Sequence, residues 1–142
     1  MEQGLNNHAD CIFCQIVRGE APSFSLCQDE QALAFMDIFP VAPGHVLVIT
    51  REHFENIFEA SDDSLRAVAA MSKRLAQAIR TQLAPEGLGV FQLNGAAAGQ
   101  TVFHYHQHLI PRSGGDSLQL HSRVRGNDGE LVALSRKLAA AL

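Results

Sequence analysis

Three histidines occur at alternate positions in residues 104–108, which read His-Tyr-His-Gln-His. In an extended strand the side chains alternate between two faces, so His104, His106 and His108 would share one face at about 6.5–7 Å spacing. Sheet cores are built mainly from apolar side chains, and three titratable rings in a row are unusual there. The pattern therefore indicates a site that coordinates a ligand or reacts with it.

The chemistry open to such rings is nucleophilic. A neutral imidazole attacks readily near pH 7, because its ordinary pKa of about 6.5 leaves much of the ring unprotonated. Attack on phosphorus would give a phosphohistidine and divide one difficult displacement into two easier ones. The attacking ring needs an acceptor, such as a backbone carbonyl, to fix its tautomer. Flanking rings can donate hydrogen bonds to phosphate oxygens or to the leaving group.

Two further motifs supply candidate ligands. The loop at residues 95–101 reads Gly-Ala-Ala-Ala-Gly-Gln-Thr, and small side chains let backbone N–H groups approach an anion closely. We expect Gly99, Gln100 and Thr101 to bind phosphate there, although a glycine-ended connection can also be only a turn. Cys11 and Cys14 form a Cys-x-x-Cys pair, which with two histidines would suffice for a tetrahedral zinc site. The other interpretation is that both thiols are small buried side chains.

The elements that must position these residues form a single α+β domain over residues 1–142. Alternating or β-branched patterns predict strands at residues 24–28, 32–38, 45–50 and 90–93, followed by the histidine strand from residue 104. Apolar residues at intervals of three and four predict a long helix over residues 61–84, and a short helix should cover 130–142. Residues 1–10 read as a loose polar lead-in, and residues 113–142 as a C-terminal tail with its helix.

The bulk composition excludes several classes of protein. The chain has 46% apolar and 18% charged residues, which is typical of a globular domain. Its net charge of −4 gives no basic surface for a nucleic-acid polymer, and no apolar run is long enough to cross a membrane. The three cysteines are an odd number, and the N-terminal residues lack the pattern of a signal peptide. We therefore expect reduced thiols and a cytoplasmic protein.

Residues 98–110 resemble the signature of the histidine triad (HIT) family, His-φ-His-φ-His-φ-φ, where φ is apolar. Leu109 and Ile110 fit this pattern, whereas Gln107 is polar where an apolar residue is usual. The blocks at residues 11–14, 34–38 and 43–49 also resemble family landmarks in the family's order, so the resemblance covers nearly all of residues 11–112. It implies an α+β, HIT-like fold with an antiparallel five-stranded sheet, one long helix and a short C-terminal helix.

The resemblance also implies an activity. Members of the family are hydrolases or transferases that cleave at the α-phosphorus of nucleoside phosphoramidates, dinucleoside polyphosphates or nucleotidyl-sulfate compounds through a nucleotidylated histidine. By this resemblance His106 is the nucleophile, His108 contacts phosphate and His45 from a neighbouring strand supports the cluster. The expected small-molecule partner is a purine nucleotide.

The nucleotide contacts are carried over in the same way. The resemblance implies that Asp37 binds the ribose hydroxyls, while Phe13, Phe35 and Ile38 line a slot for the base. Leu93 stands where many relatives have an amide side chain, so we expect Asn94 to take over that polar contact. The sequence leaves open that one such contact is missing.

A subset of the family binds structural zinc through residues that match Cys11, Cys14, His53 and His104. Family members commonly form a two-fold homodimer through the long helix and an adjoining strand. Both properties are expectations from the resemblance.

Two alternative functions remain open at this stage. The three histidines could instead be ligands of a catalytic zinc ion that activates water, although no carboxylate lies within the triad. The protein could also be a nucleotide-binding sensor with little turnover, for which Gln107 and Leu93 are the departures of interest. His8 and His121 lie in polar stretches, where we expect solvated side chains.

Overall fold

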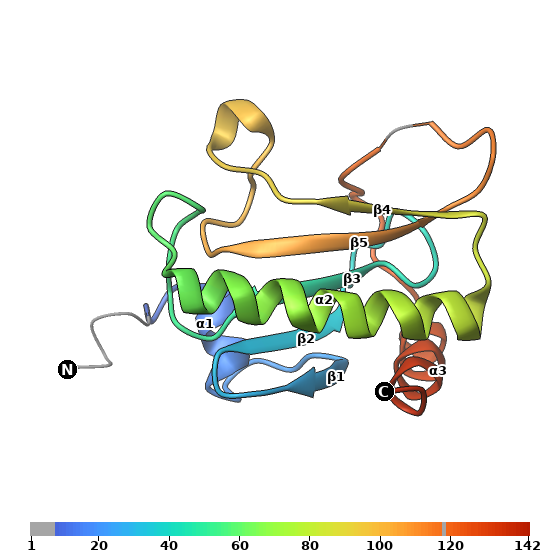
Figure 1. Ribbon diagram of the computed structural model, residues 1–142, viewed down its shortest axis with the longest axis horizontal. Coiled ribbons are helices and arrows are strands. Elements are labelled where there is room, and N and C mark those ends of the chain that lie inside the picture. The colour runs from blue at the N-terminus through green and yellow to red at the C-terminus, as the bar shows by residue number, and fades with distance from the viewer. Residues whose placement is uncertain (1–7, 118) are drawn as a thin grey trace.

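The computed structural model describes residues 8–117 and 119–142. The elements in chain order are α1 (Ile12–Val17), β1 (Ser25–Gln28), β2 (Ala32–Met36), β3 (Val46–Thr50), α2 (Asp62–Leu83), β4 (Gly87–Phe91), the 3₁₀ helix η2 (Ala96–Ala98), β5 (His106–Arg112) and α3 (Asp128–Ala139) (Figure 1). Most of the lead-in predicted at residues 1–10 lies outside the described residues. Within the described residues, every helix is too short or too polar to cross a bilayer.

The five strands form one antiparallel sheet in the order β1-β2-β3-β5-β4, which confirms the predicted fold class. Strand β5 lies between β3 and the edge strand β4. In the register with β3, His106 pairs with Ile49 and His108 pairs with Leu47. An interior strand of the sheet therefore carries two of the three histidines.

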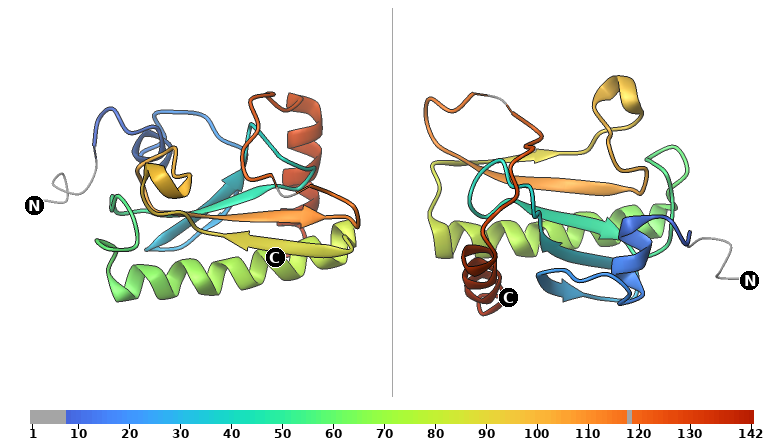
Figure 2. Two further views of the ribbon diagram at one scale, coloured as in Figure 1. Left: turned by 90° about the horizontal axis from the view of Figure 1, so that it is seen from above. Right: turned by 180° about the vertical axis from the view of Figure 1, so that it is seen from behind.

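Strand alternation divides the core into two layers. Val46, Val48 and Leu109 pack with the apolar side of α2, whereas Leu47 and Ile49 face the opposite layer with Phe13 of α1 and Phe35 of β2. Figure 2 shows α2 along one face of the sheet, and α1 and the segment after β5 on the other. His106 and His108 belong to this second face, because they alternate with Leu109 along β5.

The long helix α2 agrees with the prediction for residues 61–84. Its N-terminus is capped by the hydroxyl of Ser61, which accepts a hydrogen bond from the backbone N–H of Ser64. Asp62 and Asp63 in the first turn complement the helix dipole, and Ala84 ends the helix in a left-handed conformation. The helix supplies a rigid support beneath β5.

Two strand boundaries near the site differ from the prediction. Strand β5 begins at His106 and not at His104, since the backbone N–H of Tyr105 bonds to the carbonyl of Phe54 outside the sheet. Strand β2 ends at Met36 and not at residue 38, because the carboxylate of Asp37 accepts a hydrogen bond from the N–H of Phe39 and starts a turn.

Strand β4 and helix α3 also differ from their predicted bounds. Strand β4 covers Gly87–Phe91 in place of the predicted residues 90–93, because pairing with β5 from Gly87 to Arg112 outweighs the low strand propensity of glycine. Helix α3 covers Asp128–Ala139 in place of 130–142, because the side chain of Asn127 caps the N–H of Glu130.

Candidate active site and metal centre

The ring of His106 lies on the sheet face opposite α2 and is held in one tautomer. Its Nδ1 is 2.7 Å from the carbonyl oxygen of His104, so Nδ1 carries the hydrogen and Nε2 keeps a lone pair. The ring of Phe13 packs edge-on against it, at 5.2 Å between centroids. Burial lowers the pKa of His106, which favours the neutral ring. This is the arrangement that a nucleophilic imidazole requires.

A chain of hydrogen bonds fixes the tautomers of His45 and His108. The backbone N–H of Val41 donates to Nδ1 of His45 at 3.0 Å, so the hydrogen of this neutral ring is on Nε2. Nε2 of His45 lies 3.0 Å from Nδ1 of His108 and donates to it, which leaves the hydrogen of His108 on its own Nε2. That N–H is buried and has no partner within the described residues.

The rings of His45 and His108 both stay neutral at ordinary pH. Burial lowers the pKa of His45 to about 4 and that of His108 to about 3. His108 therefore acts as a directed N–H donor and not as a cation. Since buried donors normally have a partner, its unpaired Nε2–H indicates that an acceptor belongs at this place.

Asp37 lies at the end of β2, beside the hydrogen-bonded pair of His45 and His108. One carboxylate oxygen accepts from the N–H of Phe39 at 2.8 Å, and the other is 3.4 Å from Nε2 of His45. The 3.0 Å contact to His108 is the stronger bond of that N–H, so the carboxylate keeps acceptor capacity for a ligand. Burial raises the pKa of Asp37 to about 6.

The loop before the triad is braced by its own side chains. Gln100 is buried, its carbonyl accepts from the N–H of Gly95, and its amide donates to the carbonyls of Glu55 and Val102. Gly99 has φ +102°, a conformation that favours glycine. The backbone N–H groups of residues 95, 98, 99 and 100 all donate within the loop. The loop is therefore more closed than a phosphate-binding turn predicted from its small residues.

Asn94 is also engaged in local structure. Its side chain pairs with the amide of Gln92 and accepts from the N–H of Ile57 at 2.8 Å. Contacts of Asn94, Gln100 and exposed Thr101 with a nucleotide stay predictions, and for the two amides they require a change in these bonds. Of the residues predicted to line the base slot, Phe13 and Phe35 are buried and contact each other edge-on, whereas Ile38 is half-buried.

The four predicted metal ligands meet in a second cluster beside the triad. Nδ1 of His104 lies 3.4 Å from Sγ of Cys11 and 3.5 Å from Sγ of Cys14, and Nδ1 of His53 lies 3.3 Å from Sγ of Cys14. These four ligand atoms all lie within 4.8 Å of one another. The cluster joins α1 to the segments that follow β3 and precede β5.

The donors fit a tetrahedral zinc ion. With Zn–S near 2.3 Å and Zn–N near 2.0–2.1 Å, tetrahedral sulfur and nitrogen ligands are about 3.6 Å apart, close to the separations seen here. Nε2 of His104 donates to the carbonyl of Thr50 at 2.6 Å, so Nδ1 presents its lone pair to the cysteines. Burial raises the pKa of Cys14 to about 11, and a bound cation would be needed to ionise it.

The same geometry disagrees with a catalytic zinc ion held by the three triad histidines. The free nitrogen of His104 faces Cys11 and Cys14, whereas the Nδ1 of His106 is bonded to a carbonyl. Within the described residues, the groups that converge are Cys11 with Cys14, His53 and His104, and Asp37 with His45 and His108. In the described residues the three triad histidines therefore do not form a shared set of ligands for a catalytic zinc ion.

Two histidines expected to be solvated contact the clusters. His121 is exposed, yet its Nε2 lies 2.7 Å from the carbonyl oxygen of Gly99 and its ring lies 5.8 Å from that of His108. His8 stacks on His53 with 3.8 Å between ring centroids. Sequence reasoning missed both, because each comes from a polar segment without strand or helix periodicity.

A cleft of about 650 Å³ lies away from these clusters. It is formed by the loop before β3, the C-terminal end of α2 and the end of β5, and its lining includes Pro43, Leu83 and Arg112. The chemistry described above does not extend to it. Geometry and tautomers therefore place the candidate site on the sheet face that carries His106 and His108.

Comparisons with known proteins show which family the chain resembles. A family model described as "HIT domain" matches residues 18–115. The chain is 41% identical over 112 residues to an adenosine 5′-monophosphoramidase of Candida albicans, which covers 76% of this chain and 74% of that protein. It is 34% identical over 133 residues to an adenylylsulfatase of Arabidopsis thaliana, with 94% and 68% covered.

A solved structure is also similar. It is a zinc-bound histidine triad family protein from Mycobacterium smegmatis, 37% identical, with a TM-score of 0.82 over 93% of this chain and 92% of that one. The likeness of the two folds extends over nearly the whole chain.

Proposed function

Because the chain belongs to the HIT domain family, we propose that it is a nucleotide hydrolase that cleaves at the α-phosphorus through a nucleotidylated His106. The relatives whose names denote a monophosphoramidase and an adenylylsulfatase support this class of reaction. Both of those activities release a group from the phosphorus of an adenosine nucleotide.

The observation that carries the proposal is that a ring nitrogen with a free lone pair, on His106, lies near a ring N–H without an acceptor in the described residues, on His108. Nε2 of His106 is available for attack, and the buried Nε2–H of His108, two residues along the strand, has no acceptor among residues 8–117 and 119–142. The two ring centroids are 5.0 Å apart. A phosphate group supplies an electrophilic phosphorus for the first nitrogen and an acceptor oxygen for the second.

The reaction then proceeds in two displacements. Nε2 of His106 forms a bond to the α-phosphorus as the bond to the leaving group breaks. The Nδ1–H of His106 remains bonded to the carbonyl of His104, which stabilises the charge that develops on the ring. His108 donates to a phosphate oxygen throughout, and water then breaks the nitrogen–phosphorus bond.

A turnover screen tests this proposal. The substrates are adenosine and guanosine phosphoramidates and dinucleoside polyphosphates, and His106→Ala should abolish turnover while nucleotide still binds. Alkaline denaturation during turnover of a labelled nucleotide should trap label on the unsubstituted protein only, because the nitrogen–phosphorus bond survives in alkali and is hydrolysed in acid. A fully active His106→Ala variant contradicts the mechanism, and tight binding without turnover by the unsubstituted protein favours the sensor function.

We also propose that Cys11, Cys14, His53 and His104 hold a structural zinc ion. Bound zinc would supply a cross-link that ties α1 to the sheet, close to the ring of Phe13 that packs on His106. Metal analysis of protein purified without added zinc should give about one zinc per chain, and Cys14→Ser should lose it. Cys27→Ser is the matched control, because Cys27 lies on β1 outside the cluster.

The nucleotide contacts and the assembly complete the proposal. Asp37 would accept hydrogen bonds from the ribose hydroxyls, and Phe13, Phe35 and Ile38 would contact a purine base. We expect a homodimer that pairs through α2 and the edge strand β4, on which Val90 is 53% exposed. Light scattering should give twice the mass of the 15.4 kDa chain, and a monomer would contradict this assembly.

A further inference from the structure

The segment between β5 and α3 returns across the sheet face that carries the triad. Figure 2 shows it crossing on the side opposite α2. The guanidinium of Arg112 donates to the carbonyls of Ser117 and Gln119, and the N–H of Gly126 donates to the carbonyl of Ile38 at 2.7 Å. The segment is therefore attached to the sheet at both ends.

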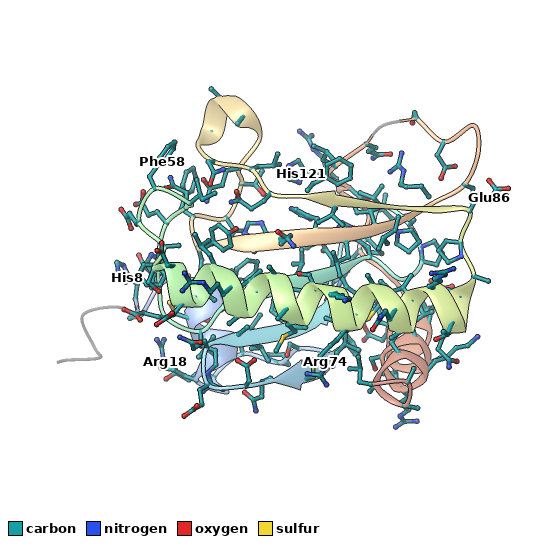
Figure 3. The ribbon with its side chains drawn as sticks, in the orientation of Figure 1. His8, Arg18, Phe58, Arg74, Glu86 and His121 are labelled. Carbon is teal, nitrogen blue, oxygen red and sulfur yellow. The ribbon has the colours of Figure 1, made fainter. Side chains whose placement is uncertain are left out.

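His121 lies in the middle of this segment and its position is fixed on two sides. The amide of Gln119 donates to the carbonyl of His121 at 2.8 Å, and the ring Nε2 lies 2.7 Å from the carbonyl of Gly99. His121 is labelled in Figure 3, and its contacts with Gly99 and His108 place it beside β5 and the loop that precedes it. Because Nε2 donates to Gly99, Nδ1 remains available on the other side of the ring.

The ring of His121 also lies next to that of His108. Its centroid is 5.8 Å from that of His108 in an edge-to-face contact. Burial raises the pKa of Asp37 and lowers those of His45, His106 and His108, and the charge of His121 adds a smaller lowering effect on all four.

An in-line displacement defines which side of the site needs an acid. His106 is anchored through Nδ1 to the carbonyl of His104, so Nε2 is the attacking atom and the leaving group departs from the side of phosphorus opposite this nitrogen. His108 and His45 are buried and neutral, and neither is suited to give up a proton. His121 is exposed to solvent and belongs to the outer layer.

We propose that His121 is a further catalytic residue, which protonates the group that leaves the α-phosphorus. This inference rests on the proposed nucleotidyl transfer by His106. As the bond from Nε2 of His106 to phosphorus forms, the bond to the leaving group breaks with its electron pair. The leaving group takes the Nδ1 proton of the His121 imidazolium, while Nε2–H keeps its bond to Gly99. In the second displacement Nδ1 takes a proton from the attacking water.

The substrate class follows from this role. A leaving group that is strongly basic after departure, such as an alkylamine, depends on protonation, whereas p-nitrophenolate leaves without it. The site should therefore favour phosphoramidates of basic amines. His121→Gln removes the acid but retains an N–H for the carbonyl of Gly99, and Val124→Ala in the same segment is the control, since Val124 is 75% exposed.

The experiment compares kcat on an alkylamine adenosine phosphoramidate and on the p-nitrophenyl ester of AMP. His121→Gln should lower kcat by about 10²-fold or more on the amine and by less than about fivefold on the ester, and Val124→Ala should change neither. Equal losses on both substrates would show a structural role, and no loss on either would show no role; both results overturn the inference. If the unsubstituted protein turns over neither substrate, the proposed function fails and this inference fails with it.

Discussion

Replacing His108 by leucine should separate stability from activity. The Nε2–H of His108 is buried and has no partner in the part of the chain that the structure describes, and such a group costs about 1–3 kcal/mol in the ligand-free protein. Leucine removes that cost but loses the bond from His45 at 3.0 Å, which contributes about 0.5–1.5 kcal/mol. The N–H of His45 can then turn to Asp37, at 3.4 Å. The free energy of unfolding should therefore change by between about −0.5 and +2.5 kcal/mol.

The activity of the His108→Leu variant should fall, although its stability is largely kept. Loss of one donor to the phosphate in the transition state should lower kcat by about 10²–10³-fold. Urea unfolding of ligand-free protein gives the stability, and turnover of an adenosine phosphoramidate gives kcat. Gln107→Leu is the matched control on the same strand. Its amide donates to Ser72 of α2 at 2.9 Å on the opposite face, so it should lose about 1 kcal/mol of stability and keep its activity.

The refuting result is a clear loss of stability in His108→Leu. A decrease of more than about 1 kcal/mol would mean that Nε2 of His108 has a favourable partner in the free protein. The hydrogen-bond chain from Val41 through His45 would then not end in a donor reserved for ligand.

Three further outcomes are expected. Binding of a non-hydrolysable nucleotide should weaken as the pH falls through about 6. The pKa of Asp37 is raised to about 6, so its carboxylate, beside His45 and His121, is protonated there and loses acceptor capacity. Calorimetry from pH 5 to 8 checks this, and a 2′,3′-dideoxynucleotide is the insensitive control. Removal of zinc should lower Tm by about 8–16 °C in a thermal scan. Zinc at a thousandfold excess over its Kd contributes about 4 kcal/mol, and each kcal/mol corresponds to about 2–4 °C. An unchanged Tm would argue against a structural metal. Gly99→Ala should lower the free energy of unfolding in urea by about 1–3 kcal/mol, because φ at Gly99 is +102° and the new methyl group meets Leu93 at 3.3 Å. Gly87→Ala is the control: its methyl group has open space, so stability should change little.

The sequence predicted those parts of the site that depend on local periodicity. The alternation of residues 104–108 correctly placed His106 and His108 on one face, and it placed Gln107 opposite, where Ser72 satisfies its amide. The convergence of Cys11 and Cys14 with two histidines came from the resemblance to a family and is present in the fold.

The remaining parts depend on contacts between distant segments. The approach of His121 to Gly99 spans 22 residues, and the bond from Gln100 to the carbonyl of Glu55 spans 45. No pattern within a strand or helix specifies such pairs. The early start of β4 at Gly87 likewise follows from pairing with β5 and not from the residue itself.

His104 belongs to both clusters at once. Its ring nitrogen faces the two cysteines, while its backbone carbonyl holds the hydrogen on the nucleophilic ring. If the proposed zinc ion binds there, oxidation of Cys11 or Cys14 would disturb the residue whose carbonyl orients His106. A redox change or a shortage of zinc would then reach the proposed nucleophile through a single shared residue, His104.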